Sequence, residues 1–296
     1  HIIVVGYTSG SLPGFTNPSP LLNWDVAVFA FDADGTPLWG HQLGGVESDL
    51  GLAVTTDADD NVFVSGSTWG ALPGHTHAGR LDAYVAKLDA DGVSQWTRQL
   101  GGPADEWTGA ITTNAAGSVF ITGKTFGALP GQTSFGQTDM FLLQYDADGN
   151  LIWSNNVGTA SWEEAAGIAA DAAGNLYLAG LTDRGDSGFV THALVEKYDS
   201  TGALVWSRTF GVETYQHAAG VGVDASGTVY VGGNVIEWLD PEPNLADVFV
   251  ATYDSDGNPG WSRRFGTNAD DYLTSVAVSP DGVLFVGGFT YGTFPG

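Results

Sequence analysis

Cysteine is absent from the 296 residues of this chain, and methionine occurs once. Without cysteine the chain has no disulfide framework, no thiol nucleophile and no thiolate ligand for a metal. It also lacks an apolar stretch of about 20 residues, the length that a membrane-spanning helix needs, so we expect no membrane insertion. Phosphate-binding and dinucleotide-binding glycine motifs are absent, and no nucleophile-elbow motif lies between a strand and a helix. We therefore predict no catalytic residues.

Basic residues are scarce. Nine Lys and Arg residues stand against 34 Asp and Glu residues, which gives a formal net charge of −25. A chain this acidic repels phosphate, so we do not expect nucleic acid as a partner. Three explanations of the charge remain, and they are compatible with one another: solubility in a salty medium, binding of divalent cations, and turns built with Asp.

Most of the sequence consists of copies of an internal repeat of roughly 55 residues. This period is typical of solenoids and propellers. Each copy has an Asp seven residues before a Trp, a Gly five residues after it, and a polar residue, usually acidic, ten residues after it. The five tryptophans are Trp39, Trp96, Trp153, Trp206 and Trp261. We divide the chain into a partial unit 1–24 and full units 25–81, 82–138, 139–191, 192–246 and 247–296.

Each unit is predicted to contain four strands and no helix. The first alternates apolar and polar residues, the second carries the Trp, the third is built of Gly and Ala, and the fourth is β-branched and aromatic. Four strands per unit predict an all-β fold, a β-propeller of four-stranded blades that forms a single domain over 1–296. We expect five blades if the ring closes alone, and six or more if the chain is a fragment. The small-residue strand should be innermost, and each Trp should wedge against the neighbouring blade.

The repeat resembles the bacterial β-propeller repeat family known as SBBP. The resemblance rests on the Asp–hydrophobic–Asp-x-x-Gly–Trp run, on the pairs Gly44-Gly45 and Gly101-Gly102, and on the G-x-T-x-G-x-x-Pro loop. It covers nearly the whole chain and implies a place in a large secreted or surface-attached bacterial protein. The same Asp-x-x-Gly…Trp spacing also resembles the blades of quinone-dependent dehydrogenases. The cofactor-contacting residues of those enzymes are not recognisable here.

Asp-x-Asp-Gly segments follow the first strand of four units, as in Asp32-Ala33-Asp34-Gly35. Alternating carboxylates suggest calcium, which takes six to eight oxygen ligands. The further acids of a calcium-binding loop are missing, however. We therefore interpret these segments as hairpin turns in which Asp caps the turn and Gly takes the positive φ.

A second set of acids precedes the inner strands. We predict that these four residues gather near a channel mouth, where they are candidate ligands for calcium: Asp49, Glu106, Glu163 and Asp271. Gln216 holds the equivalent place in the fourth unit. The alternative is that each side chain accepts hydrogen bonds from backbone amides of a neighbouring blade.

Aromatic residues occur beside these acids and in the long loops after the fourth strands. Both connections should emerge on one face of each blade, where aromatic rings with carboxylates suit a sugar or a protein. The candidate ligand-binding residues are Trp69, Trp107, Trp162, Tyr215, Trp238 and Tyr272. The alternative is that the rings pack onto loop backbone. The clustered His75 and His77 are interpreted as solvated loop residues.

These observations predict a non-catalytic binding or adhesion module of a secreted or cell-surface protein, with a glycan or protein ligand on the long-loop face. We expect a monomeric domain within a larger chain, located outside the cell. A calcium-stiffened structural scaffold is the alternative. A propeller enzyme, such as a glycan lyase, a hydrolase or a quinone-dependent oxidoreductase, is less favoured. The fourth unit breaks the repeat symmetry most, so a specific site is expected there first.

Overall fold

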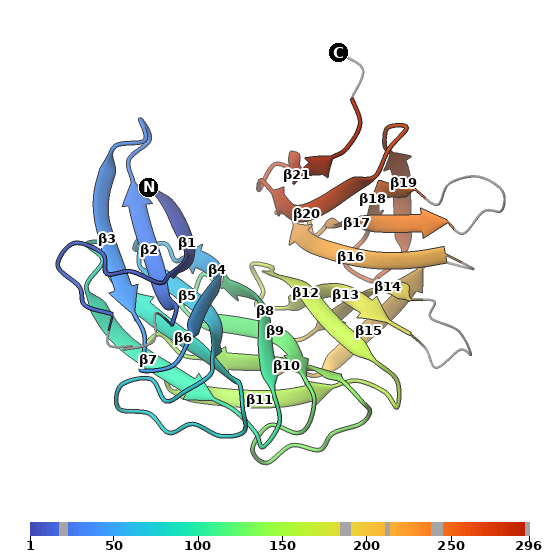
Figure 1. Cartoon of the computed structure of the whole chain (residues 1–296). Helices are drawn as coiled ribbons and strands as arrows, with labels where there is room; N and C mark the ends of the chain where they lie inside the picture. The colour runs from blue at the N-terminus through green and yellow to red at the C-terminus, as the bar shows by residue number, and fades with distance from the viewer. Residues whose placement is uncertain (18–22, 184–190, 211–213, 238–244, 294–296) are drawn as a thin grey trace. The chain divides into compact units, whose positions relative to one another are not determined.

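The computed structural model describes residues 1–17, 23–183, 191–210, 214–237 and 245–293 (Figure 1). Every regular element in these ranges is a β-strand. The strands fall into two compact units, 1–157 (unit 1) and 158–296 (unit 2), which are described separately below. No helix that is long and apolar enough to cross a membrane occurs in the described ranges.

The described residues of unit 1 form eleven strands. They are β1 (Ile2–Thr8), β2 (Asp25–Phe31), β3 (Pro37–Leu43), β4 (Asp49–Thr56), β5 (Val62–Thr68), β6 (Asp82–Leu88), β7 (Ser94–Leu100), β8 (Glu106–Thr113), β9 (Val119–Thr125), β10 (Asp139–Tyr145) and β11 (Leu151–Val157).

In the described part of unit 2 there are ten strands. They are β12 (Glu163–Ala170), β13 (Leu176–Thr182), β14 (His192–Tyr198), β15 (Leu204–Phe210), β16 (Thr214–Val223), β17 (Val229–Glu237), β18 (Ala246–Tyr253), β19 (Pro259–Phe265), β20 (Asp271–Val278) and β21 (Leu284–Thr290).

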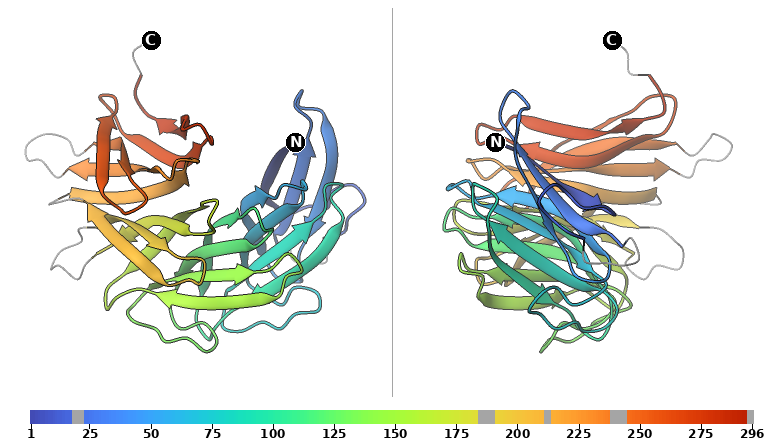
Figure 2. Two further views of the ribbon diagram at one scale, coloured as in Figure 1. Left: turned by 180° about the vertical axis from the view of Figure 1, so that it is seen from behind. Right: turned by 60° about the vertical axis from the view of Figure 1, so that its left-hand side comes forward.

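The complete sheets are four-stranded and antiparallel, and their strand order follows the chain. Unit 1 holds β4-β5-β6-β7 and β8-β9-β10-β11, together with the three-stranded sheet β1-β2-β3. Unit 2 holds β12-β13-β14-β15 and β16-β17-β18-β19, together with the pair β20-β21 (Figures 1 and 2). The all-β prediction is therefore confirmed, and the four-stranded sheets have the form of propeller blades. The number of blades and the closure of a ring stay predictions.

The sheets do not coincide with the repeat units read from the sequence. Within the predicted unit 82–138, β6 and β7 belong to the sheet that begins with β4 of the preceding unit, and only β8 and β9 start the next sheet. The boundaries of the sheets are therefore offset from those of the repeat units by two strands. The reason is hydrogen bonding: the fourth strand pairs with the first strand of the next repeat, in the register Val62↔Leu88 to Thr68↔Asp82.

Small residues are required on the inner strands, as predicted. In unit 2, a β-carbon on Gly167 of β12 would stand 2.9 Å from the α-carbon of Gly220 on β16, and one on Gly220 would stand 3.0 Å from the backbone of Val276 on β20. Neighbouring inner strands thus approach too closely for larger side chains, and Gly in a strand often marks such an approach.

Three tryptophans of the outer strands, Trp39, Trp96 and Trp206, wedge against the next sheet of their own unit. In unit 1, the indole N–H of Trp96 on β7 donates to the carbonyl of Ala147, 3.1 Å away in the β10–β11 turn. Trp39 bonds Ala90 at 2.9 Å and Trp206 bonds Ser255 at 3.1 Å in the same way. Trp261 differs from the prediction, because it is 46% exposed. Within the described residues, the sheet that follows it consists of β20 and β21 alone, and no turn between outer strands contacts the ring.

The Asp-x-Asp-Gly segments are hairpin turns. Asp32 Oδ1 accepts hydrogen bonds from the backbone N–H groups of Asp34 and Thr36, at 3.0 and 2.7 Å. Gly35 has a φ of 80°, in the left-handed region that Gly adopts readily. This part of the sequence interpretation is confirmed.

Candidate functional site

Two connections of each sheet lie at the same end, as predicted. The backbone N–H of Trp69, after β5, donates to the carbonyl of Ser48, just before β4. Phe126 and Asp105 make the same bond beside β9 and β8. We call this end of unit 1 the loop edge and define it as residues 7–17, 23–24, 44–48, 69–81, 101–107 and 126–138.

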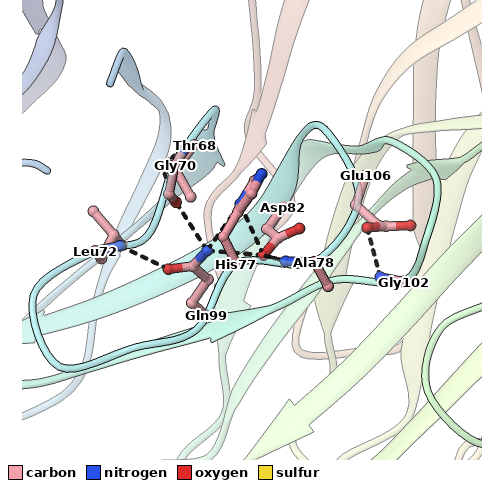
Figure 3. Close-up of polar contacts among 9 residues, drawn as sticks. All are labelled: Thr68, Gly70, Leu72, His77, Ala78, Asp82, Gln99, Gly102 and Glu106. Carbon is pink, nitrogen blue, oxygen red and sulfur yellow. Dashed lines mark hydrogen bonds and ion pairs between the residues drawn. The ribbon is translucent and has the colours of Figure 1, made fainter. Parts of the chain in front are cut away.

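The long loops of this edge are held by buried amide side chains. Gln99 of β7 accepts the Leu72 N–H at 2.9 Å and donates to the Gly70 carbonyl at 3.0 Å. Its amide also donates to Asp82 Oδ2 at 2.8 Å, and the same oxygen accepts the Ala78 N–H (Figure 3). One Gln and one Asp therefore fix both ends of the loop between β5 and β6.

This amide–Asp clamp recurs in the neighbouring loops of unit 1. Gln42 bonds Leu12, Gly10 and Asp25 in the same way, and Asn156 bonds Leu129, Gly127 and Asp139. In unit 2, Arg264 takes the place of the amide and forms an ion pair with Asp247 at 2.6 Å. The clamp explains why an Asp stands at or next to the start of the first strand in four of the five repeats, at Asp25, Asp82, Asp139 and Asp247.

His77 takes part in one clamp, so its interpretation as a solvated loop residue was wrong. Its side chain is 22% exposed, and Nδ1 lies 3.2 Å from Asp82 Oδ2 (Figure 3). The contact ties the loop after β5 to the start of β6. His75 lies in the same loop and is half-buried.

The predicted metal-ligating acids cap the backbone that precedes them. Glu106 Oε2 accepts the Gly102 N–H at 2.9 Å, and Oε1 accepts the Thr125 hydroxyl at 2.9 Å. Asp49 accepts the Gly45 N–H at 2.6 Å. In unit 2, Glu163 and Asp271 accept the N–H groups of Thr159 and Thr267. Each amide belongs to the segment that leads into the acid's own strand, whereas the alternative had expected amides of a neighbouring blade.

Each acid of this set in unit 1 also faces the clamp Asp of the preceding sheet. A β-carbon on Gly101 would stand 2.1 Å from Asp82 Oδ1 and 3.0 Å from Glu106 Oε2. Gly44 is placed in the same way between Asp25 and Asp49. Only Gly leaves room for two carboxylates at these points, which accounts for Gly44 and Gly101 five residues after Trp39 and Trp96.

Burial raises the pKa of carboxyl groups in both of these pairs, Asp25–Asp49 and Asp82–Glu106. It raises the pKa of the Glu106 carboxyl to about 7, and the nearby charge of Asp82 adds to the effect. Burial likewise raises the pKa of Asp49 to about 6. Asp25 Oδ1, Asp49 Oδ1 and Asp82 Oδ1 are buried and have no hydrogen-bond partner among the described residues. The pairs are therefore suited to holding a proton or a cation.

The structure brings the predicted acids of unit 1 into pairs with a clamp Asp, but it does not gather the four predicted acids at one place. No group of three or more His, Asp or Glu side chains within the described ranges is arranged to hold a metal ion. Gln216 of β16 is half-buried at the equivalent position of the fourth repeat. The prediction of calcium at Asp49, Glu106, Glu163 and Asp271 stays a prediction.

Aromatic side chains gather at the loop edge of unit 1. Trp69 and Trp107 pack edge to face, with ring centroids 5.8 Å apart, and both are half-buried. Two aromatics that sequence reasoning missed, Tyr7 and Trp24, form a second pair at 5.4 Å and are 53% and 45% exposed. Trp24 could have been found from its place directly before the clamp residue Asp25.

The remaining predicted aromatics lie in unit 2. Trp162 is 37% exposed and Tyr215 is half-buried. Tyr272 stacks on Phe289 at 5.1 Å. Trp238 and the centre of its loop lie outside the described residues, so the expectation of a specific site in the fourth unit stays a prediction.

Comparison with known proteins supports the fold. No family model matches the sequence. The regulatory protein FlaEY of Caulobacter vibrioides is 25% identical over 317 residues, which cover 89% of this chain and 32% of FlaEY. An uncharacterized WD repeat-containing protein of Acanthamoeba polyphaga mimivirus is 20% identical, covering 88% of this chain and 19% of that protein. The chain thus spans a third or less of these two relatives.

Two solved structures resemble this chain at the level of fold. The WD40 domain of Neurospora crassa Pan2 has a TM-score of 0.51 at 11% identity, covering 88% of this chain and 67% of that one. A polysaccharide lyase that degrades ulvan has a TM-score of 0.54 at 11% identity, covering 97% and 73%. At these identities the likeness shows a propeller-like fold and carries no activity over to this chain.

Proposed function

We propose that this chain is a non-catalytic binding module that holds a protein partner at the loop edge of unit 1. The observation that carries the proposal is the gathering of partly exposed aromatics there, in the pairs Trp69–Trp107 and Tyr7–Trp24. Aromatic residues are enriched in protein interfaces and supply most hot spots. The WD-repeat name of one relative favours a protein ligand.

Rigid support strengthens this assignment. The loops that present the aromatics are fixed by the clamps of Gln42, Gln99 and Asn156. A surface that is already ordered loses little conformational entropy on binding. The net charge of −25 favours a partner with a basic surface, because complementary charge accelerates association and excludes acidic competitors.

The buried acids are engaged in structure rather than free for catalysis. Glu106 caps Gly102 and bonds Thr125, and Asp82 holds the loop through Gln99 and Ala78. General acid–base catalysis needs a carboxyl group that reaches the substrate. The geometry therefore favours binding over hydrolysis or elimination.

A calcium-stiffened scaffold is the second candidate. It is supported by the facing carboxylates beside Gly44 and Gly101, and by their buried oxygens without hydrogen-bond partners in the described part of the chain. For the binding module, we further propose an extracellular or cell-surface location and membership of the SBBP repeat family. Their support is the acidic composition, the absence of cysteine and the repeat motif.

Peptide display on the immobilised chain tests the binding proposal. We expect selected peptides to be rich in Lys and Arg and to bind more weakly as NaCl rises. The double variant Trp69→Ala, Trp107→Ala should lower their affinity at least about tenfold, as truncation of hot-spot residues does. The matched control is Leu204→Ala on β15, whose side chain is 54% exposed in unit 2.

Two results would contradict the proposal. One is a set of peptides that bind the double variant as well as the unchanged chain. The other is a glycan-array hit that the double variant loses, with no peptide that depends on either Trp. That second result would assign the loop edge to a sugar.

A further inference from the structure

A cavity of about 390 Å³ lies at the loop edge of unit 1, where the sheet β1-β2-β3 packs against the sheet β4-β5-β6-β7. This volume is in the range of pockets that bind small ligands. The lining comes from the start of β2, the end of β3, the loop after β5 and the outer strand β7. It includes Asp25, Leu43, Gly44, Leu72, Ser94 and Thr97.

Asp25 brings a buried carboxylate to this lining, and its side chain is 1% exposed. Oδ2 accepts the amide of Gln42 at 2.7 Å, whereas Oδ1 has no hydrogen-bond partner in the described part of the chain. A β-carbon on Gly44, which also lines the cavity, would stand 2.6 Å from Oδ1. The glycine therefore leaves this oxygen without a covering side chain, and a buried acceptor without a donor is costly.

The other repeats of unit 1 show which groups a clamp Asp receives. Asp82 Oδ2 accepts the Ala78 N–H at 3.0 Å and lies 3.2 Å from Nδ1 of His77, in addition to its bond with the clamp amide (Figure 3). In the third repeat, two backbone N–H groups of the loop bond the clamp Asp. Among the described residues, Asp25 receives the bond of Gln42 and no nitrogen donor from its loop. A ligand with N–H groups would supply what the other loops supply.

The charge around Asp25 favours a cationic donor. Burial raises the pKa of Asp25, and the carboxylate of Asp49 faces it across Gly44. A positive charge beside a buried carboxylate offsets its desolvation and stabilises the charged form. The chain provides one example in unit 2, where Arg264 forms an ion pair with the clamp residue Asp247 at 2.6 Å.

The lining favours an ammonium group over a guanidinium group. One oxygen of Asp25 is engaged, and a guanidinium fork binds best to two oxygens, whereas an ammonium is a compact donor that needs one. The hydroxyls of Ser94 and Thr97 add acceptors for its remaining N–H groups. Leu43 and Leu72 form an apolar wall, along which the aliphatic stem of a lysine can lie.

We infer that this cavity receives a lysine side chain of the protein partner, with the ammonium group at Oδ1 of Asp25. The inference rests on the proposed binding function and names the residue that the partner inserts. Trp69 belongs to the same loop as Leu72, so a partner that covers this tryptophan lies next to the cavity. The aromatic pairs then supply contact area, and the cavity selects for lysine.

A lysine capped at both ends, Nα-acetyl-lysine N-methylamide, is the probe, because it carries the side chain without a peptide. It is titrated into the ¹⁵N-labelled whole chain at low salt, with chelator present so that calcium does not compete for Asp25. The amide signals of Gly44 and Leu72 should shift and saturate. Binding should be lost with the neutral Nε-acetyl form, and should weaken at least about threefold with the capped arginine.

Variants of the chain locate the site. Asp25→Asn keeps an oxygen for Gln42 and removes the charge, so it should lower the affinity for capped lysine at least about tenfold. Ser94→Lys places a competing cation in the lining from an exposed position of β7, and it should abolish binding without touching the clamp. Val93→Lys is the matched control. It adds the same charge one residue away, at a side chain that is 57% exposed and outside the described lining, and should leave binding unchanged.

Three results would overturn the inference. They are the absence of any saturating shift, equal binding of capped lysine to the Ser94→Lys and unchanged chains, and binding of 1,5-diaminopentane at least about tenfold tighter than capped lysine. The last result would assign the cavity to a free amine in place of a partner's side chain.

The double variant Trp69→Ala, Trp107→Ala separates this inference from the proposed function. Neither tryptophan is among the described lining residues, so the double variant should bind capped lysine like the unchanged chain. Failure of the cavity therefore leaves the loop-edge proposal standing, and the reverse also holds. A peptide that depends on both tryptophans should in addition lose at least about tenfold in affinity on Ser94→Lys and not on Val93→Lys. Equal affinity for those two variants would contradict the insertion of a lysine.

Discussion

At the scale of single residues, Glu106 is the most informative group. Its pKa of about 7 in the folded chain lies above the 4.5 of the free side chain, because burial disfavours the charged form. A raised pKa contributes stability that is complete below pH 4.5 and is lost as pH rises through about 7. We therefore expect the free energy of unfolding to fall between pH 5 and pH 8, with Glu106 accounting for about 3 kcal/mol. Urea unfolding across this range measures the change.

Glu106→Gln should remove the share of that pH dependence that comes from Glu106, leave the share of Asp49, and stabilise the chain at pH 8. The amide keeps an oxygen for the Gly102 N–H, and its NH₂ can donate to Thr125 once the hydroxyl turns. Gln216 shows that the repeat accepts an amide at this position. Asp34→Asn changes an exposed carboxylate in a hairpin turn and should leave the pH profile unaltered. A variant as pH-dependent as the unchanged chain would contradict the assignment.

The residues of the candidate site could be found from the sequence, but their roles could not. Glu106 and Asp82 stand out because they recur at fixed distances from Trp96. That they face each other across Gly101 depends on contact between successive sheets, which spacing along the chain does not encode. Tyr7 and Trp24 were missed for a different reason, because their contact depends on the register in which β1 pairs with β2 inside one sheet.

At the scale of elements, the amide–Asp clamp determines the loop conformation. Gln99 satisfies a backbone N–H at Leu72, a carbonyl at Gly70 and a buried carboxylate at Asp82. Gln99→Ala leaves these groups without their partner, and each unsatisfied buried group is costly. We expect a loss of roughly 2 kcal/mol in stability and faster hydrogen exchange of the Leu72 amide, measured by mass spectrometry or NMR.

A graded control is present in the chain itself. Asn156 makes the equivalent contacts with a shorter side chain, at 3.2 Å to Leu129 and 3.5 Å to Asp139. Gln99→Asn should therefore keep most of the protection at Leu72 and lose less stability than Gln99→Ala. If both variants exchange at the rate of the unchanged chain, the clamp does not hold the loop.

The strands and hairpin turns could largely be predicted, because the residues that determine each of them are close together in the sequence. Alternating residues, Gly at positive φ and Asp caps mark the strands and hairpins within a few residues. The grouping into sheets was not predictable in this way. A periodic sequence can be divided at any point, and only the pairing of Thr68 with Asp82 shows that a sheet runs from β4 to β7.

At the scale of the whole molecule, the charge of −25 has to be reconciled with buried carboxylates that face one another. Self-repulsion at this net charge destabilises the compact state, and burial adds to the cost of each charged pair. Protons relieve the cost at low pH, and cations can relieve it at neutral pH. The number of blades cannot be derived from these terms, because it depends on contacts beyond any one repeat.

Calcium is the cation predicted for these acids, and its effect on the melting temperature separates specific binding from screening. Asp25 and Asp49, like Asp82 and Glu106, offer oxygens within one site, and hard oxygen ligands suit Ca²⁺. A cation that binds only the folded chain stabilises by mass action, by about 2.7 kcal/mol at a hundredfold excess over its dissociation constant.

We expect millimolar CaCl₂ at pH 7.5 to raise the melting temperature more than MgCl₂ of equal ionic strength, and chelator to reverse the gain. Glu106→Gln should reduce the calcium-specific part, whereas Asp34→Asn, in an exposed hairpin turn, should not. Equal shifts with both salts would mean that the ions only screen the net charge, and the acids would then act as backbone caps alone.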